Sequence, residues 1–289
     1  MLSRQIAQKL RGYETPFYLY DTALLRQTLE SVVYESKKYG YKVHYAIKAN
    51  YDDHLLAIIR EYGLGIDCAS GNELRKAVEA GFDPKGIVYA GVGKRDKELR
   101  YAIGQEIMAI NCESIEELLV LDAMAAEAGR TVEVALRVNP DIDPKTNHCI
   151  DTGQADSKFG ISYEEILDNA ERIRSLKHLR IVGVHLHIGS QIRELHVFEN
   201  MCQKVNVIVE NLERLGFSFR FVLKFIGMAS FYQFAICCAH LIRVGRRFQP
   251  QYAKWIPHRQ HLLFALRLFC YPNLLEGTQV VPRNQQPSA

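Results

Sequence analysis

Short apolar runs alternate with amphipathic stretches between about residue 42 and residue 222, and this alternation limits the possible folds more than any other feature. The apolar runs have the length of buried strands, and the stretches between them have helical periodicity. The strand candidates are residues 43–48, 65–69, 87–90, 108–111, 132–139, 182–188 and 220–222. Helix ends are marked by Gly81, Gly129 and Gly216, and helix starts by the capping-box pairs Ser114/Glu117 and Ser162/Glu165.

Strict alternation of strand and helix predicts an α/β fold with a parallel sheet. At this repeat length the best closed arrangement is a (β/α)8-type barrel, of which the sequence contains six firm units and the start of a seventh. We therefore expect an incomplete barrel over residues 1–222. A doubly wound open sheet is the alternative, but no G-x-G-x-x-G motif follows the first strand.

The strand–helix alternation stops at residue 222, and residues 223–289 differ in charge as well. Residues 1–222 carry 28 Lys/Arg and 32 Asp/Glu, whereas residues 223–289 carry 8 Lys/Arg and a single acid, Glu276. Residues 225–242 contain no charged side chain and are long enough to span a bilayer. Because Gln233 and His240 interrupt this segment, we do not predict a membrane partner. Residues 223–289 are expected to form a separate basic tail.

Charge and cysteine content exclude few classes of function. The net charge of +3 gives no reason to predict a nucleic-acid partner. Seven cysteines without framework spacing do not indicate a disulfide scaffold. The first 16 residues lack the continuous apolar core of a secretory signal, so we expect a cytoplasmic protein.

The predicted strands place polar side chains together on one face. Side chains alternate along a strand, so the bulky aliphatic residues share one face and should pack on the helices. Lys48, Asp67, Arg137 and His187 lie on the other face and should converge near the C-terminal mouth of the barrel. Barrel enzymes carry their chemistry at this mouth.

Each of these residues has more than one interpretation. Lys48 is either a Schiff-base lysine, with an amine activated by desolvation, or a rim lysine paired with Asp67. His185 and His187 are core histidines, a surface for an aromatic cofactor ring, or a metal pair. A metal would need further ligands, and the spacing of Asp67 and Cys68 does not favour them, so no metal is predicted.

Two further residues extend the candidate site. Ser190 lies in a small-residue turn directly after the histidine strand, where a phosphate group could bind. Glu73 either supports a cofactor together with Asp67 or is an ordinary acid in the first turn of a helix.

Together these segments resemble the fold-type-III pyridoxal-phosphate decarboxylases, the group that acts on ornithine, diaminopimelate or arginine. The matching runs, in chain order, are TPFYLYD (15–21), VHYAIKAN (43–50), GIDCASGNEL (65–74), LRVNPDID (136–143), SKFGI (157–161) and GVHLHIGSQ (183–191). Their order and spacing agree with the family across about residues 10–222. The HIGSQ and RVNPDID runs favour diaminopimelate as the substrate, although a related decarboxylase or a racemase stays open.

The resemblance implies a role for each site residue. Lys48 would hold pyridoxal 5'-phosphate through a Schiff base, His187 would stack on its ring, and Ser190 would contact its phosphate. Asp67, Glu73 and Arg137 would support the ring and the lysine. The family reaction removes the α-carboxylate of an amino acid as CO₂, here converting meso-diaminopimelate to L-lysine, and the family acts as a homodimer.

The tail departs from the family. Residues 223–289 contain no glycine-rich phosphate loop, no E-P-G-R segment and no counterpart of the C-terminal β-domain. In the family these parts supply phosphate contacts, the proton donor and the partner half of a dimeric active site. Our hypothesis is that the tail is unrelated sequence, read in a shifted frame; a divergent natural terminus is the alternative. Two functions therefore remain: a decarboxylase, or a non-catalytic incomplete barrel that at most binds the cofactor.

Overall fold

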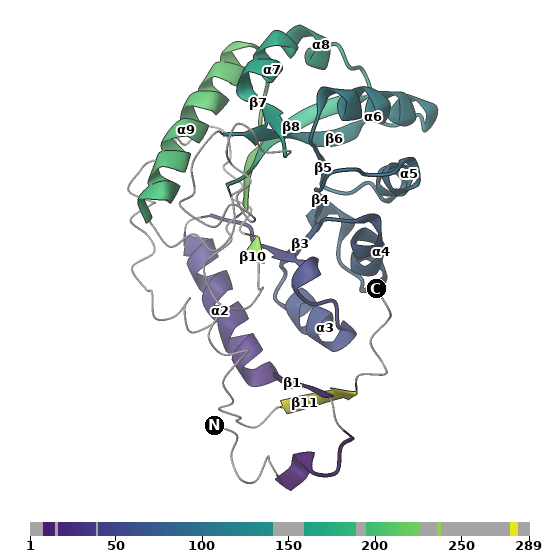
Figure 1. Cartoon of the computed structure of the whole chain (residues 1–289), viewed down its shortest axis with the longest axis vertical. Helices are drawn as coiled ribbons and strands as arrows, with labels where there is room; N and C mark the ends of the chain where they lie inside the picture. The colour runs from purple at the N-terminus through teal and green to yellow at the C-terminus, as the bar shows by residue number, and fades with distance from the viewer. Residues whose placement is uncertain are drawn as a thin grey trace.

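A computed structural model describes residues 8–14, 17–38, 40–140, 159–188, 195–225, 236–237 and 278–282. Its central feature is a run of parallel strands in the order β2-β3-β4-β5-β6-β8-β9, which follows their order along the chain. The strands curve into an arc, and the helices lie on its outer side (Figure 1). A doubly wound sheet would reverse its strand order, so the incomplete α/β barrel predicted from the sequence is confirmed.

All seven strand candidates form strands of this arc, with ends displaced by a few residues. The observed bounds are β2 His44–Ala46, β3 Gly65–Cys68, β4 Ile87–Tyr89, β5 Ala109–Cys112, β6 Val132–Asn139, β8 Leu179–His187 and β9 Phe221–Phe225. An informative displacement lies at β2, which ends at Ala46 because residues 47–49 form the 3-10 turn η1 (Ile47–Ala49).

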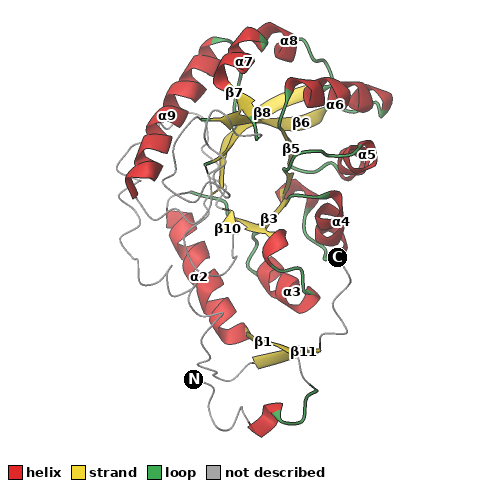
Figure 2. Cartoon of the chain, viewed as in Figure 1, coloured by secondary structure: helices red, strands yellow, loops and turns green. Residues whose placement is uncertain are grey.

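The helices between the strands cover the outer face of the arc, as Figure 2 shows. They are α2 Thr22–Lys38, α3 Asp53–Glu61, α4 Gly71–Glu79, α5 Asp96–Gln105, α6 Ile115–Glu127, α7 Tyr163–Asp168, α8 Ala170–Arg174 and α9 Leu195–Arg214, with a 3-10 turn η2 at Pro84–Gly86. The helix ends predicted at Gly81, Gly129 and Gly216 are confirmed, and all three glycines have a positive φ. Ser114 and Ser162 each accept a hydrogen bond from the third residue of the following helix, as predicted.

Two separate apolar clusters confirm the predicted assignment of strand faces. The larger lies between the strands and the helices and includes Tyr45, Ile66, Leu136 and Val184. The smaller lies on the inner face of the arc and consists of Val88, Ala109, Ala135, Val182 and Phe221. We call this inner cluster the apolar floor, because it lies below the polar ends of the strands.

Some strands were not predicted. Strand β1 (Phe17–Asp21) pairs antiparallel with β11 (Thr278–Pro282), and β10 (Ile236–Cys237) pairs antiparallel with β2. Strand β7 (Ile161–Ser162) pairs with the end of β6. Strands β10 and β11 belong to the tail, which therefore contributes short strands where the sequence shows no strand–helix alternation. The origin of the tail stays a hypothesis.

No helix in the described ranges is long and apolar enough to cross a membrane. Most of the uncharged segment 225–242 lies outside those ranges; only residue 225, in β9, and residues 236–237, in β10, belong to them.

Candidate functional site at the mouth of the barrel

The predicted site residues occupy the C-terminal ends of the parallel strands and the turns that follow them. Asp67 lies on β3, 3% exposed, and its register partner on β2 is Ala46. Arg137, 7% exposed, lies on β6 opposite His185 of β8. His187 is the last residue of β8. These predicted residues are thus held by strands whose outer faces are fixed in the main core.

Lys48 differs from its prediction. Because β2 ends at Ala46, Lys48 lies in the 3-10 turn η1 and its side chain is exposed, whereas we expected a lysine buried at a strand end. Its charge nevertheless reaches the site, since it contributes to lowering the pKa of both Glu73 and His187. Lys48 therefore offers a solvent-accessible amine beside the other site residues.

Glu73 lies in the first turn of α4, where its Oε2 atom accepts a hydrogen bond of 2.7 Å from the backbone N–H of Ala69. Burial raises the pKa of this carboxyl, while the Ala69 N–H group and the charge of Lys48 act in the opposite direction. Glu73 thus holds the end of β3 against α4 and also faces Lys48. Ser190 lies outside the described residues, and its predicted phosphate contact stays a prediction.

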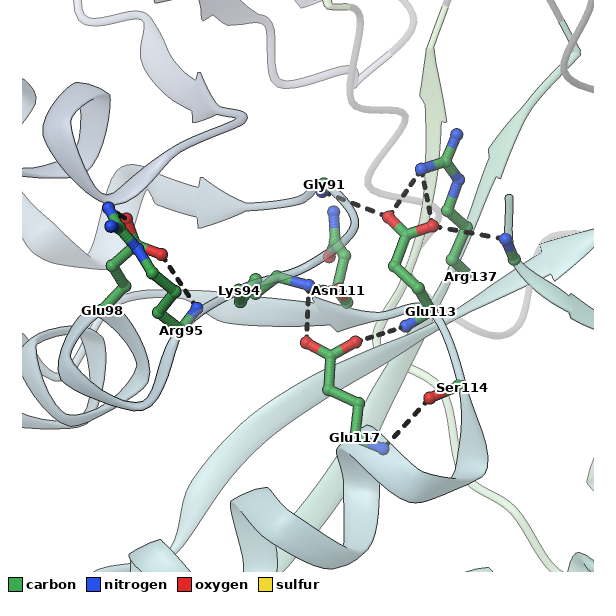
Figure 3. Close-up of polar contacts among 10 residues, drawn as sticks. Gly91, Lys94, Arg95, Glu98, Asn111, Glu113, Ser114, Glu117 and Arg137 are labelled. Carbon is green, nitrogen blue, oxygen red and sulfur yellow. Dashed lines mark hydrogen bonds and ion pairs between the residues drawn. The ribbon is translucent and has the colours of Figure 1, made fainter. Parts of the chain in front are cut away.

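Arg137 is fixed by a carboxylate that the sequence analysis did not single out. The Nη1 atom of Arg137 donates to both carboxylate oxygens of Glu113, at 2.6 and 2.8 Å, and both side chains are almost fully buried. Glu113 also accepts hydrogen bonds from the backbone N–H groups of Gly91, at 3.1 Å, and Gly160, at 3.3 Å. We call these four residues the Glu113 cluster (Figure 3). Its position directly after β5, where a catalytic barrel carries polar groups, was the available sequence clue.

A second buried ion pair lies beside this cluster. The Nζ atom of Lys94 donates to Glu117 at 2.6 Å and to the backbone oxygen of Asn111 at 2.8 Å, and its side chain is 1% exposed. The other carboxylate oxygen of Glu117 accepts from the backbone N–H of Glu113 at 2.8 Å. The predicted capping box at Ser114 is therefore only half formed, because Glu117 binds these groups and not its own helix start. The two ion pairs together brace the turns after β4 and β5.

The histidines of the barrel interior are held in the neutral state. Burial lowers the pKa of His187 to about 3 and that of His44 to about 4. For His187 the charges of Arg137 and Lys48 add to this effect. Burial also lowers the pKa of His185 well below its ordinary value. Within the described residues, no group of three or more His, Cys, Asp or Glu side chains is arranged to hold a metal ion.

These three histidines predict that the protein loses stability in mild acid. An unfolded histidine titrates near pH 6.5, so below this pH the unfolded chain binds protons that the folded chain does not. The free energy of unfolding should fall by about 1.4 kcal/mol per histidine for each pH unit, until the pH nears the folded pKa. Urea unfolding at pH 7.5, 6.5 and 5.5 measures this, and His44→Gln should remove about a third of the slope. Equal midpoints at pH 7.5 and 5.5 would contradict the prediction.

Comparisons with known proteins agree with this architecture. A family model described as pyridoxal-dependent decarboxylase, pyridoxal binding domain, matches residues 25–223. The chain is 45% identical over 206 residues to the diaminopimelate decarboxylase of Bacteroides thetaiotaomicron, covering 71% of this chain and 53% of that protein. It is 40% identical over 210 residues to the Aquifex aeolicus enzyme of the same name, covering 73% of this chain and 50% of that protein.

A solved structure gives the same result. The crystal structure of diaminopimelate decarboxylase from Helicobacter pylori complexed with L-lysine has a TM-score of 0.72 and 29% sequence identity. The match covers 90% of this chain and 62% of that one. The chain spans about half the length of the curated relatives it matches. The family predicted from the motifs is confirmed: the chain belongs to the pyridoxal-dependent decarboxylases, through their pyridoxal-binding domain.

Proposed function

We propose that the chain binds pyridoxal 5'-phosphate at the mouth of the barrel, attached through Lys48, and that the protein decarboxylates meso-diaminopimelate to L-lysine. The observation that carries the proposal is the exposed amine of Lys48 beside a polar inner face that includes Arg137 and His187. The names of the relatives support the substrate, because they are diaminopimelate decarboxylases and one was solved with L-lysine.

The side chains present suit this cofactor. An exposed primary amine is the group that reacts with the aldehyde of pyridoxal phosphate. His187 is neutral at pH 7 and offers a flat uncharged ring, while Arg137 keeps its positive charge beside the bound anion. When bound, pyridoxal phosphate supplies an electron sink for the electron pair that remains when CO₂ leaves.

The residues of this chain then have distinct tasks. Lys48 would hold the cofactor through its side-chain amine. Glu73 faces Lys48, whose charge acts to lower the pKa of the Glu73 carboxyl. Arg137 keeps one orientation because its Nη1 atom is bound to Glu113, which leaves its remaining N–H groups for the ligand. Asp67 and Ser190 are proposed to support the ring and the phosphate.

A second candidate function is cofactor binding without turnover. It is favoured by residues 223–289, which carry none of the family motifs expected there. Homodimer formation stays a prediction for the same reason.

Two measurements on the purified full chain separate these functions. Titration with pyridoxal phosphate should give a visible absorbance band of the bound cofactor, and addition of meso-diaminopimelate should release CO₂ and form L-lysine. Binding without CO₂ release would leave only the second candidate. The absence of both would contradict the proposal as a whole. Ornithine and arginine, supplied separately, test the choice of substrate.

A further inference from the structure

Among the residues that the structure describes, two fully buried polar side chains on the inner face of the barrel lack hydrogen-bond partners. Asn111 of β5 is 0% exposed and His185 of β8 is 1% exposed. Within the described part of the chain, neither amide atom of the Asn111 side chain nor either ring nitrogen of His185 has a partner. Leaving such a group unsatisfied costs about 1–3 kcal/mol, so most native proteins satisfy it with protein, water or ligand. These residues therefore indicate a site for a polar group.

Both side chains share the inner face with the apolar floor and lie on the side of it nearer the mouth of the barrel. Asn111 follows the floor residue Ala109 by two positions on β5, and Arg137 follows the floor residue Ala135 by two positions on β6. Residues two apart on a strand share a face. His185 is the register partner of Arg137, so it belongs to the same layer. The register partner of Asn111 on β6 is the floor residue Ala135, so Asn111 lies one step deeper along the strands than Arg137 and His185. The three side chains thus form a staggered polar layer across three neighbouring strands.

Within this layer, His185 lies one step below His187, the level proposed for the cofactor ring, and Asn111 lies deeper. His187 follows His185 by two residues on β8, which places it about 7 Å further toward the mouth. Figure 3 shows the Asn111 amide projecting to the same side of β5 as the carboxylate of Glu113. A ring held beside His187 would therefore turn one edge toward Asn111 and His185.

The electrostatic surroundings select the kind of group that fits. Besides burial, the positive groups Arg137, Lys94 and Lys48 lower the pKa of His185, and His187 acts on it in the same direction. A neutral imidazole offers one donor and one acceptor, and a carboxamide offers two donors and an acceptor oxygen. The layer thus supplies uncharged donors within a positive potential, which suits an electron-rich oxygen. A protonated ring nitrogen would be disfavoured there.

We propose that Asn111 and His185 bind the phenolic oxygen of the pyridoxal phosphate ring by hydrogen bonds. This inference rests on the proposed function and extends it to Asn111, which the sequence analysis did not single out, and to His185, for which the sequence analysis left several interpretations open. The phenolic oxygen is attached to the ring carbon next to the one that carries the aldehyde, so it lies near the bond to Lys48. The influence of Lys48 on His185 agrees with that arrangement.

The test compares cofactor affinity with the stability of the cofactor-free protein. In the full chain, Asn111→Leu and His185→Leu should each raise the Kd for pyridoxal phosphate at least about tenfold, as expected for a hydrogen bond to a charged group. The same variants should raise the thermal midpoint of the cofactor-free protein, because they remove unsatisfied polar atoms. General damage to the fold would instead weaken cofactor binding and lower the thermal midpoint together.

Matched variants separate the hydrogen bonds from packing. Cys112→Ala changes the neighbouring residue of β5, which is fully buried in the main core, and should lower the thermal midpoint while leaving the Kd unchanged. His185→Gln and Asn111→Thr keep hydrogen-bonding groups and should bind within a few-fold of the wild type. They also allow the test to proceed if a leucine variant does not fold.

An analogue without the phenolic oxygen distinguishes the cofactor from an ordered water. 3-Deoxypyridoxal phosphate should bind the wild type and both leucine variants with equal, reduced affinity. An unchanged Kd for pyridoxal phosphate in both leucine variants would show that the layer holds water only, and would overturn the inference. A leucine variant that discriminates against the analogue as strongly as the wild type does would also overturn it. If the wild-type chain itself binds no cofactor, the proposed function fails first and this inference fails with it.

Discussion

Replacing Glu113 with alanine is expected to lower the free energy of unfolding by about 3–5 kcal/mol, the usual cost of removing one partner from a buried ion pair. Glu113 neutralises Arg137, and both side chains are less than 10% exposed. Its carboxylate also satisfies the backbone N–H groups of Gly91 and Gly160. The alanine variant would leave a buried guanidinium and two amides without acceptors.

A surface pair of similar length gives the matched control. Arg100 and Glu127 lie 2.7 Å apart, but their side chains are 54% and 60% exposed. Glu127→Ala should therefore cost less than about 1 kcal/mol. Urea unfolding followed by far-ultraviolet circular dichroism measures both variants. Equal costs for Glu113→Ala and Glu127→Ala would show that the Glu113 cluster does not brace the barrel.

A smaller change separates charge from hydrogen bonding at this position. Glu113→Gln keeps an oxygen acceptor for Gly91 or Gly160 but removes the charge that balances Arg137. We expect a stability between those of the wild type and the alanine variant. Because Arg137 then loses its fixed orientation, the affinity for pyridoxal phosphate should fall as well.

The barrel itself could be predicted because its pattern is local. Parallel strands buried on both faces appear as short apolar runs, and alternate positions within each run decide which side chains face inward. That pattern places Asp67, Arg137 and His187 on one face without any knowledge of contacts. The short strands β1, β7, β10 and β11 lacked such a pattern, and β1 pairs with a segment more than 250 residues away in the chain.

The Glu113 cluster could not be predicted by the same reasoning. Glu113 is 24 residues from Arg137 and 47 residues from Gly160, and its role depends on the order in which β4, β5 and β6 pair. Sequence spacing instead suggested a local partnership between Ser114 and Glu117, of which only the serine half forms. Lys48 was placed on the strand because its run of apolar neighbours continues past the point where η1 begins. The predicted domain boundary at residue 222 and the contact of Ser190 stay predictions.

Replacing Lys48 with alanine is expected to abolish covalent attachment of pyridoxal phosphate while changing the free energy of unfolding by about 0.5 kcal/mol or less, since the side chain is exposed. Lys94 is the contrasting lysine at this mouth. Its amine is buried and bound to Glu117, so it cannot approach an aldehyde without breaking an ion pair.

Borohydride reduction of the protein with one equivalent of pyridoxal phosphate, followed by peptide mass spectrometry, should therefore label Lys48 and not Lys94. Lys94→Ala should destabilise the fold, because it leaves the Glu117 carboxylate without its partner, yet it should retain the label on Lys48. Lys48→Arg keeps the charge near Glu73 and His187 but offers no reactive amine, so it should give neither label nor CO₂ release. Full labelling of the Lys48→Ala variant at another lysine would show that the exposed amine of η1 is not the point of attachment.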